Sequence, residues 1–109
     1  MEYYPDNWVV LKITHEREKP LYKVLAGWSG GYTQGDSWRM NSGITGVDKQ
    51  AYHWEFYGTS GSVYICHQSD YRLTMATSNI YNQLKDNYGD QIELMPEDTN
   101  WTQLDYTDE

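Results

Sequence analysis

Short runs of alternating apolar and polar residues, separated by turn-forming residues, constrain the fold of this chain more than any other feature. In the segment S-W-R-M-N-S-G-I-T (37–45), Trp38 and Met40 fall on one side of an extended chain. Arg39 and Asn41 fall on the other side. This period of two residues is typical of a strand that buries one face of an antiparallel sheet. We therefore expect a chain built mainly of hairpins.

Five segments have the alternation, or the β-branched and aromatic composition, of strands. They are 7–14, 21–28, 37–45, 51–58 and 62–67. The segments between them are charged or rich in glycine and serine, which is typical of turns and loops. They are 15–20, 29–36, 46–50 and 59–62. The pattern predicts an antiparallel meander, either an open sheet or a small barrel-like arrangement.

The period of the apolar residues changes after the fifth segment, and a stripe at every fourth position predicts an amphipathic helix. The stripe consists of Ala76, Ile80, Leu84 and Tyr88. Thr74, Thr77 or Ser78 can cap its start, and Gly89 is placed to end it in a left-handed conformation. Residues 91–95 alternate again and predict a short edge strand. The fold class is therefore α+β, with five to six strands and one C-terminal-half helix packed on one face.

The 109 residues are enough for one domain with a modest core. We expect a single α+β domain over 1–96, followed by an acidic C-terminal tail over 97–109. The tail either docks partly, through Trp101, Leu104 and Tyr106, or is disordered. The expected core residues are Val9, Leu11, Ile13, Val24, Ala26, Trp38, Met40, Ile44, Trp54, Phe56, Val63, Ile65, Ile80 and Leu84.

The net charge of −8 is unevenly distributed, since no lysine or arginine follows Lys85. This acidic part of the chain would repel a phosphate backbone or an anionic membrane, which argues against both as partners. We consider three roles for this acidic run: solubility, binding of a basic partner, or mimicry of nucleic acid. The single Cys66 excludes an internal disulfide, and the N-terminal residues M-E-Y-Y-P-D-N lack the pattern of a signal peptide. We expect a cytoplasmic protein.

One motif suggests an enzyme. G-W-S-G-G (27–31) fits the pattern G-x-S-x-G, which in α/β-hydrolases holds the catalytic serine on a turn between a strand and a helix. Here Ser29 is followed by further glycines and then by another strand segment, so the helix is missing. His53 and His67 lie in strand segments with no aspartate at a suitable spacing. We interpret the glycines as a hairpin loop and expect no catalytic residues.

Metal and thiol chemistry have no better support in the sequence. Cys66 and His67 are neighbours on a strand and point to opposite faces, so they cannot pair with each other. A cysteine in such a strand is expected to be an inert small apolar residue. The histidine and acidic residues match no zinc, iron or calcium spacing, and there is no phosphate loop or dinucleotide motif. We therefore expect neither a metal nor a cofactor.

The 11 tyrosines and 5 tryptophans are more than a small core can hide, so several should be exposed, Tyr57 and Tyr64 among them. Tyrosine and tryptophan are enriched where proteins bind one another. The first hypothesis is thus a non-enzymatic module that binds a protein partner or a second copy of itself. The candidate binding residues near the glycine-rich loop are Trp28, Tyr32, Asp36, Trp38, Arg39 and Asn41.

Two alternatives stay open. Trp28, Tyr32 and Trp38 would form a stacking surface for a glycan or another small ligand, with polar contacts from neighbouring residues. Aromatic strand faces could also stack the bases of single-stranded nucleic acid, although the shortage of lysine and arginine argues against this.

The segments G-W-S-G-G-Y-T-Q-G-D-S-W-R-M-N-S-G-I (27–44) and Y-G-T-S-G-S-V-Y-I-C-H (57–67) resemble small uncharacterised proteins of tailed bacteriophages, marine ones in particular. The resemblance carries no fold, activity or site residue. It implies a phage accessory protein that is made in a bacterial cytoplasm. If the binding module is encoded by a phage, we expect its partner to be a host protein.

Overall fold

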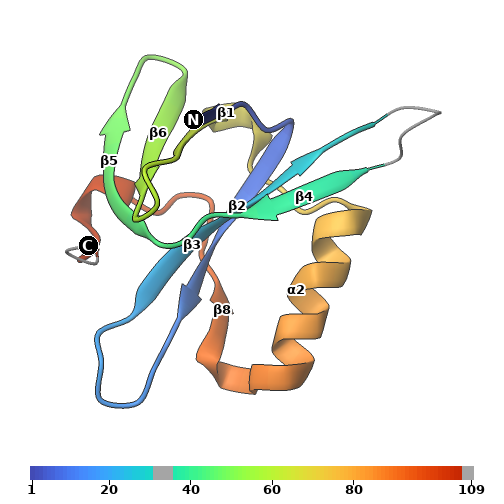
Figure 1. Ribbon diagram of the computed structural model, residues 1–109, viewed down its shortest axis with the longest axis vertical. Coiled ribbons are helices and arrows are strands. Elements are labelled where there is room, and N and C mark those ends of the chain that lie inside the picture. Colours follow the sequence, from blue (N-terminus) through green and yellow to red (C-terminus); the bar gives the residue numbers. More distant parts are fainter. Residues whose placement is uncertain (31–35, 107–109) are drawn as a thin grey trace.

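The computed structural model describes residues 1–30 and 36–106. Within these residues the chain forms eight strands, one α-helix and three short 3₁₀ helices (Figure 1). The strands are β1 (Glu2–Tyr3), β2 (Asn7–Ile13), β3 (Leu21–Trp28), β4 (Ser37–Met40), β5 (Ile44–Lys49), β6 (His53–Gly58), β7 (Val63–His67) and β8 (Ile92–Leu94). The helices are η1 (Gln68–Asp70), α2 (Met75–Tyr88), η2 (Gly89–Gln91) and η3 (Trp101–Gln103).

The strands form two four-stranded sheets, in the orders β1-β7-β6-β5 and β4-β3-β2-β8. All neighbours are antiparallel except β1 and β7, which are parallel. The α+β class with one helix in the C-terminal half is confirmed. The number of strands exceeds the expected five to six because β1 was not expected and because the segment 37–45 forms two strands.

The break in that segment explains why there are two sheets. Asn41 takes the place of a strand residue beside Val24: its N–H donates to the Val24 carbonyl (3.0 Å) and its side-chain Oδ1 accepts from the Val24 N–H (2.9 Å). Gly43 then adopts a φ of 139°, which other residues rarely reach, and the chain crosses to the second sheet. The expected turn at 46–50 is therefore wrong, because β5 continues to Lys49.

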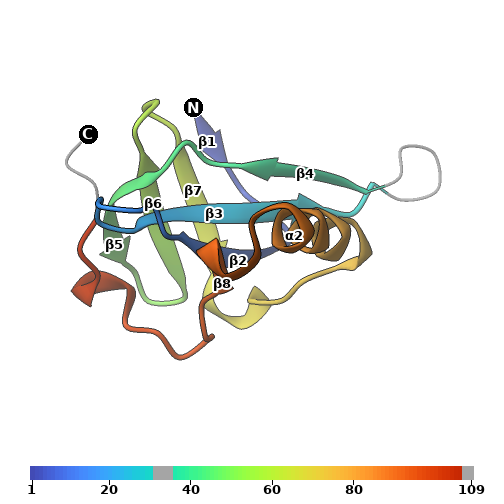
Figure 2. The same ribbon diagram turned by 90° about the horizontal axis from the view of Figure 1, so that it is seen from below.

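The sheet β4-β3-β2-β8 is covered on both faces, so alternate residues of β2 and β3 enter two different cores (Figures 1 and 2). One face meets the second sheet and the C-terminal segment; the other meets α2. We call the first core the aromatic cluster: Trp8, Val10, Tyr22, Val24, Ala26, Ile44, Phe56, Tyr64, Cys66 and Trp101. We call the second the aliphatic cluster: Val9, Leu11, Leu25 and Ile92, with Ile80 and Leu84 of α2 packed against it.

The expected core is correct in part. Val9, Leu11, Val24, Ala26, Ile44 and Phe56 are buried. The prediction that Trp38 is buried is wrong, since 46% of its surface is exposed. In β7 the buried residues are Tyr64 and Cys66, whereas Val63 and Ile65 were expected. Both faces of β7 are apolar in sequence, so alternation alone does not identify the face that meets the other sheet.

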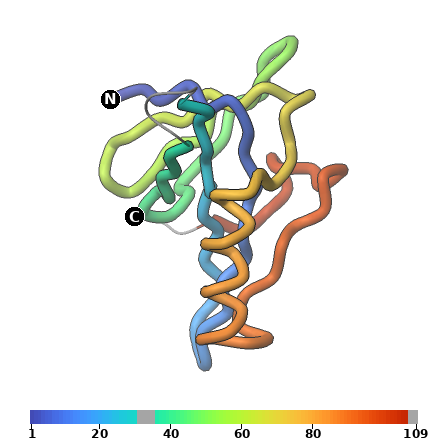
Figure 3. The backbone as a smooth tube through the Cα atoms, turned by 90° about the vertical axis from the view of Figure 1, so that its right-hand side faces the viewer, coloured from blue at the N-terminus to red at the C-terminus, as the bar shows by residue number. Residues whose placement is uncertain are grey.

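The helix α2 begins and ends close to the residues that the sequence indicated. Thr74 is its N-cap, and the Thr77 hydroxyl oxygen accepts a hydrogen bond from the Thr74 N–H (2.8 Å). Gly89 ends the helix with a φ of 56°, and its N–H donates to the Lys85 carbonyl. The helix contacts β3, beside which it runs in Figure 3. The expected edge strand forms as β8, which follows η2 and pairs with β2.

The segment after β8 returns to the aromatic cluster. Trp101 is 1% exposed, and its ring lies within 6.0 Å of the rings of Trp8, Phe56 and Tyr71. The Tyr106 hydroxyl donates to the Trp101 carbonyl. The C-terminal segment thus contributes a central residue of the core.

Candidate functional site

Of the six residues singled out near the glycine-rich loop, the five that the structure describes do not form one surface. Tyr32 lies outside the described residues. Trp28 and Trp38 occupy neighbouring strands but opposite faces of the sheet, since Trp38 is the partner of Gly27 in the β3–β4 register. Trp28 is half-buried and its Nε1–H donates to the Tyr4 carbonyl (2.9 Å). These two indoles therefore cannot stack on one ligand.

Asp36 and Arg39 are exposed, and Asn41 is buried. The Arg39 guanidinium lies 4.7 Å from the centre of the Tyr3 ring, and the Trp28 ring meets Tyr3 edge-on at 6.3 Å. Of the six residues, the structure thus brings Trp28 and Arg39 together, around Tyr3. Asn41 holds the end of β4 against β3 and has a structural role.

Ser29 is joined to the connection between β1 and β2. Its backbone N–H donates to the Asp6 carboxylate (2.9 Å), and the Asp6 N–H donates to the Gly27 carbonyl (2.9 Å). The next element in the described part of the chain is β4. The one histidine–carboxylate hydrogen bond found among the described residues, His53 with Glu55 (3.1 Å), belongs to β6 in the other sheet.

Cys66 lies in the aromatic cluster, and burial raises the pKa of its thiol well above the ordinary value. Within residues 1–30 and 36–106, no three histidine, cysteine or acidic side chains gather as a metal site would require. The helix α2 is too short and too polar to cross a membrane, and the described part of the chain has no other helix that could do so.

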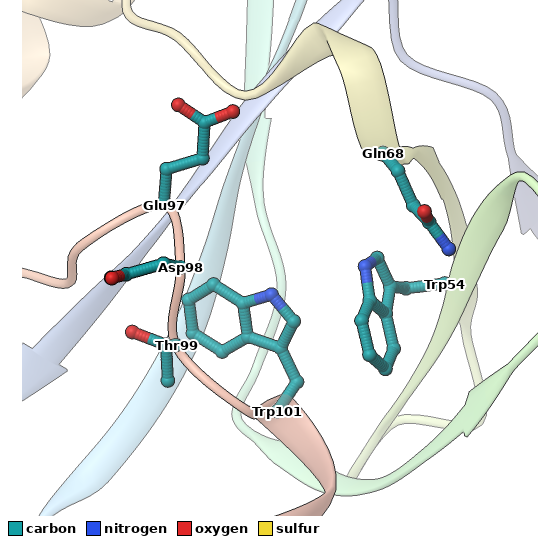
Figure 4. Close-up of a pocket in the computed structure, with 6 residues that line it drawn as sticks. All are labelled: Trp54, Gln68, Glu97, Asp98, Thr99 and Trp101. Carbon is teal, nitrogen blue, oxygen red and sulfur yellow. The ribbon is translucent and has the colours of Figure 1, made fainter.

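The structure instead presents an open cleft of about 560 Å³ between β6, η1 and the segment that follows β8 (Figure 4). We call it the tryptophan cleft. Its lining residues come from three separate parts of the sequence: Trp54, Gln68, Glu97, Asp98, Thr99 and Trp101.

The two indoles differ in exposure and share one orientation. Trp54 is half-buried, and Trp101 is almost fully buried, so it presents little more than its ring edge to the cleft. Both indole nitrogens point toward the space between the rings (Figure 4). Trp8 and Trp28 donate their indole N–H groups to carbonyls at 2.7 and 2.9 Å. The N–H groups of Trp54 and Trp101 have no such acceptor among the described residues, and Trp54 is the more exposed of the two.

The acidic residues of the cleft lie in a turn that is held by a hydrogen bond. Glu97 and Asp98 are exposed, and both carboxylates belong to the turn that opens at Pro96. The Thr99 hydroxyl donates back to the Pro96 carbonyl (2.6 Å), which holds that turn.

Lys49 places its ammonium nitrogen 5.5 Å from the centre of the Trp54 ring. The Trp54 indole therefore already accepts a cation.

Sequence reasoning missed this site because it divided the residues between two regions. Trp54 was expected in the core, and Glu97 and Asp98 were expected in the tail. The one signal that could have indicated the cleft is the run P-E-D-T-N-W, in which two acids come shortly before a tryptophan.

Comparison of the chain with known protein families, with characterised proteins and with solved structures finds no significant match. The function of the cleft is therefore inferred from its own residues.

Proposed function

We propose that this protein is a non-enzymatic binding module that takes up an arginine or lysine side chain of a partner protein in the tryptophan cleft. One observation carries the proposal: a half-buried indole, Trp54, and two acidic residues, Glu97 and Asp98, line the same cleft. Indole faces attract cations through the ring quadrupole, and carboxylates attract them by charge.

The magnitudes indicate how such a module would work. An exposed cation–π contact stabilises a complex by about 0.5–1 kcal/mol, and an exposed ion pair by about 0–1 kcal/mol. The cleft alone would therefore give weak binding. A stable complex needs roughly 1,000 Å² of buried surface around it. The cleft supplies selectivity for a cation, and the surface around it supplies the affinity.

The charge of the chain supports a basic partner. The net charge is −8, and both acids of the cleft belong to the part of the chain without lysine or arginine. Complementary charge raises the association rate more than the affinity. The setting that we propose is a bacterial cytoplasm, with the module encoded by a phage and acting on a host protein; the resemblance of 27–44 and 57–67 to phage proteins supports it. A second copy of the chain is an alternative partner.

The proposal is tested with three short peptides that differ at one position, which is arginine, lysine or glutamine. The indole N–H resonances of Trp54 and Trp101 are followed by NMR. We expect the two cationic peptides to shift both resonances in a saturable, salt-sensitive manner, and the glutamine peptide to have no effect. Equal shifts with all three peptides would contradict a cation site.

Two variants assign the effect to the cleft. Trp54→Ala and the double variant Glu97→Gln/Asp98→Asn should each abolish the difference between the cationic and glutamine peptides. Asp86→Asn, which removes an exposed acid of α2 outside the cleft, is the matched control and should bind like the unsubstituted protein. If the double variant binds the arginine peptide as before, the carboxylates have no role in recognition.

A glycan or another neutral small ligand is a second candidate for the same cleft. The two indole N–H groups without a protein acceptor favour it, because sugar hydroxyls can accept such bonds while a sugar ring stacks on Trp54. Quenching of tryptophan fluorescence across a panel of sugars, with and without Trp54→Ala, tests it. Single-stranded nucleic acid fits less well, because Glu97 and Asp98 would repel its phosphates.

A further inference from the structure

A second cavity, of about 340 Å³, lies on the other side of the sheet at the C-terminal end of α2. We call it the aliphatic cavity. Figure 3 shows that end of the helix and the β2–β3 hairpin at the same end of the molecule. Six of the lining side chains are largely apolar: Ile13, Leu21, Met40, Leu84, Tyr88 and Ile92. The other three are polar: His15, Lys23 and Gln91.

The cavity exists because the helix ends before the sheet does. α2 covers Leu11 and Leu25, which are fully buried, and Gly89 then ends the helix. Beyond that point Ile13 and Leu21 are only half-buried, although they continue the same face of β2 and β3. Unlike the tryptophan cleft, this cavity is walled mainly by aliphatic side chains. Its volume is within the range of small-molecule sites, about 300–1,000 Å³.

The charges at this end of the molecule are opposite to those of the cleft. Four of the 8 lysines and arginines lie within residues 12–23, and Lys23 and His15 line the cavity. No carboxylate of the described residues lines it. Lys19 is joined to Asp105 at 3.3 Å, but Lys23 makes no ion pair within the described residues. Its ammonium is therefore available to an anion placed over an apolar cavity.

We propose that the aliphatic cavity binds a small amphipathic carboxylate, with an unbranched acyl chain between α2 and the sheet and its carboxylate paired with Lys23. The flexible, unbranched side chain of Met40 can adapt to an acyl chain. A single ammonium matches one carboxylate in charge, while the aliphatic walls exclude polar ligands. This proposal uses no residue of the tryptophan cleft, so it is independent of the function proposed above.

The probes are decanoate, decanol and decyltrimethylammonium, used below the concentrations at which they form micelles. Binding is followed by NMR through the methyl groups of Ile13, Leu21, Met40 and Ile92. We expect saturable binding of decanoate with the shifts confined to the cavity, and decanol and decyltrimethylammonium should bind more weakly. No saturable decanoate binding, or equal binding of decanol, would overturn the proposal. Shifts centred on Trp54 and Trp101 would overturn it as well.

Substitutions test the role of the ammonium. Lys23→Met should weaken decanoate binding by roughly tenfold, as expected for the loss of a charge-assisted contact, and should leave decanol unaffected. Lys23→Arg should restore binding. Lys12→Met, on the opposite face of the hairpin, is the matched control and should bind decanoate normally. Denaturant unfolding of each variant establishes that it folds. Equal affinities of Lys23→Met and Lys12→Met would overturn the carboxylate assignment.

Discussion

The two faces of the sheet β4-β3-β2-β8 are closed in different ways. On the aromatic face, large rings with polar tips meet, and these tips bond to the backbone: Trp8 donates to the His67 carbonyl at 2.7 Å, and Tyr71 donates to the Met95 carbonyl at 2.5 Å. On the aliphatic face, the stripe of α2 covers branched side chains that have no polar atoms.

This difference determines how the segments packed on each face are positioned. Hydrogen bonds are directional, so the aromatic face holds residues from distant parts of the chain in defined places. Burial of aliphatic surface is not directional, so α2 covers only the part of the sheet that its length spans. The aromatic face therefore has an almost fully buried tryptophan at its centre, with the open tryptophan cleft beside it, whereas the cavity of the aliphatic face lies at the C-terminal end of the helix.

The largest effect that we expect comes from removing the central ring of the aromatic face. Trp101→Ala should lower the free energy of unfolding by about 3–5 kcal/mol, because it empties a fully buried site. Leu84→Ala, on the half-buried helix stripe, should lower it by about 1–2 kcal/mol. Denaturant unfolding measures both. Equal losses would contradict the difference between the faces.

A smaller loss is expected where the aliphatic face is tightest. A Cβ atom at Gly27 would lie 2.5 Å from Asn7 Oδ1 and 3.0 Å from Thr77 Cγ2, and both of these side chains are buried. Gly27→Ala should therefore lower stability by about 1–3 kcal/mol. Gly46→Ala is the control, since a Cβ there meets nothing within 4 Å. If the two variants unfold at the same denaturant concentration, β3 and α2 are not in close contact.

The buried hydroxyl groups of the aromatic face should make the stability of the protein depend on pH in the alkaline range. Burial raises the pKa of Tyr71 to about 12 from the ordinary 10.0, although the hydrogen bond from the Val10 N–H opposes this. The folded protein thus holds the phenol proton more tightly than the unfolded chain. This contribution to stability is complete below pH 10 and is lost as the pH rises toward 12.

Unfolding measured across this range should show that loss, and Tyr71→Phe should show a shallower decline than the unsubstituted protein. An equally steep decline in the variant would mean that Tyr71 does not carry the effect.

The smallest effect concerns Cys66, whose raised pKa predicts that the native thiol reacts negligibly with a disulfide reagent. Unfolding in denaturant should restore the full reaction. Rapid labelling of the folded protein would show that the aromatic face opens readily, which the packing of Cys66 in that cluster argues against.

The hairpin of β2 and β3 and the helix α2 could be predicted because their signals are local. A glycine at 89 and a stripe from Ala76 to Tyr88 identify a helix whatever packs against it. The break at 41–43 could not be predicted, because the alternation from Trp38 to Ile44 continues through it. Only the contact of Asn41 with Val24 distinguishes one strand from two.

The candidate site was less predictable than the fold. Trp54 and Trp38 have similar sequence surroundings, yet one lines a cleft and the other lies exposed on an unrelated face. Glu97 and Asp98 line the same cleft as Trp54 only because Trp101 anchors the C-terminal segment in the aromatic cluster. No spacing of residues in the sequence predicts that the C-terminal segment and β6 lie at the same cleft.

The amino-acid sequence by itself determined the α+β class, the strand and helix periods and the uneven charge, because each depends on neighbours in the chain. The tertiary structure decided the division into two sheets, the face that each tryptophan occupies and the position of both cavities. These depend on which distant surfaces bury one another, and the free energy of burial is a property of the packed surfaces and not of the order of the residues.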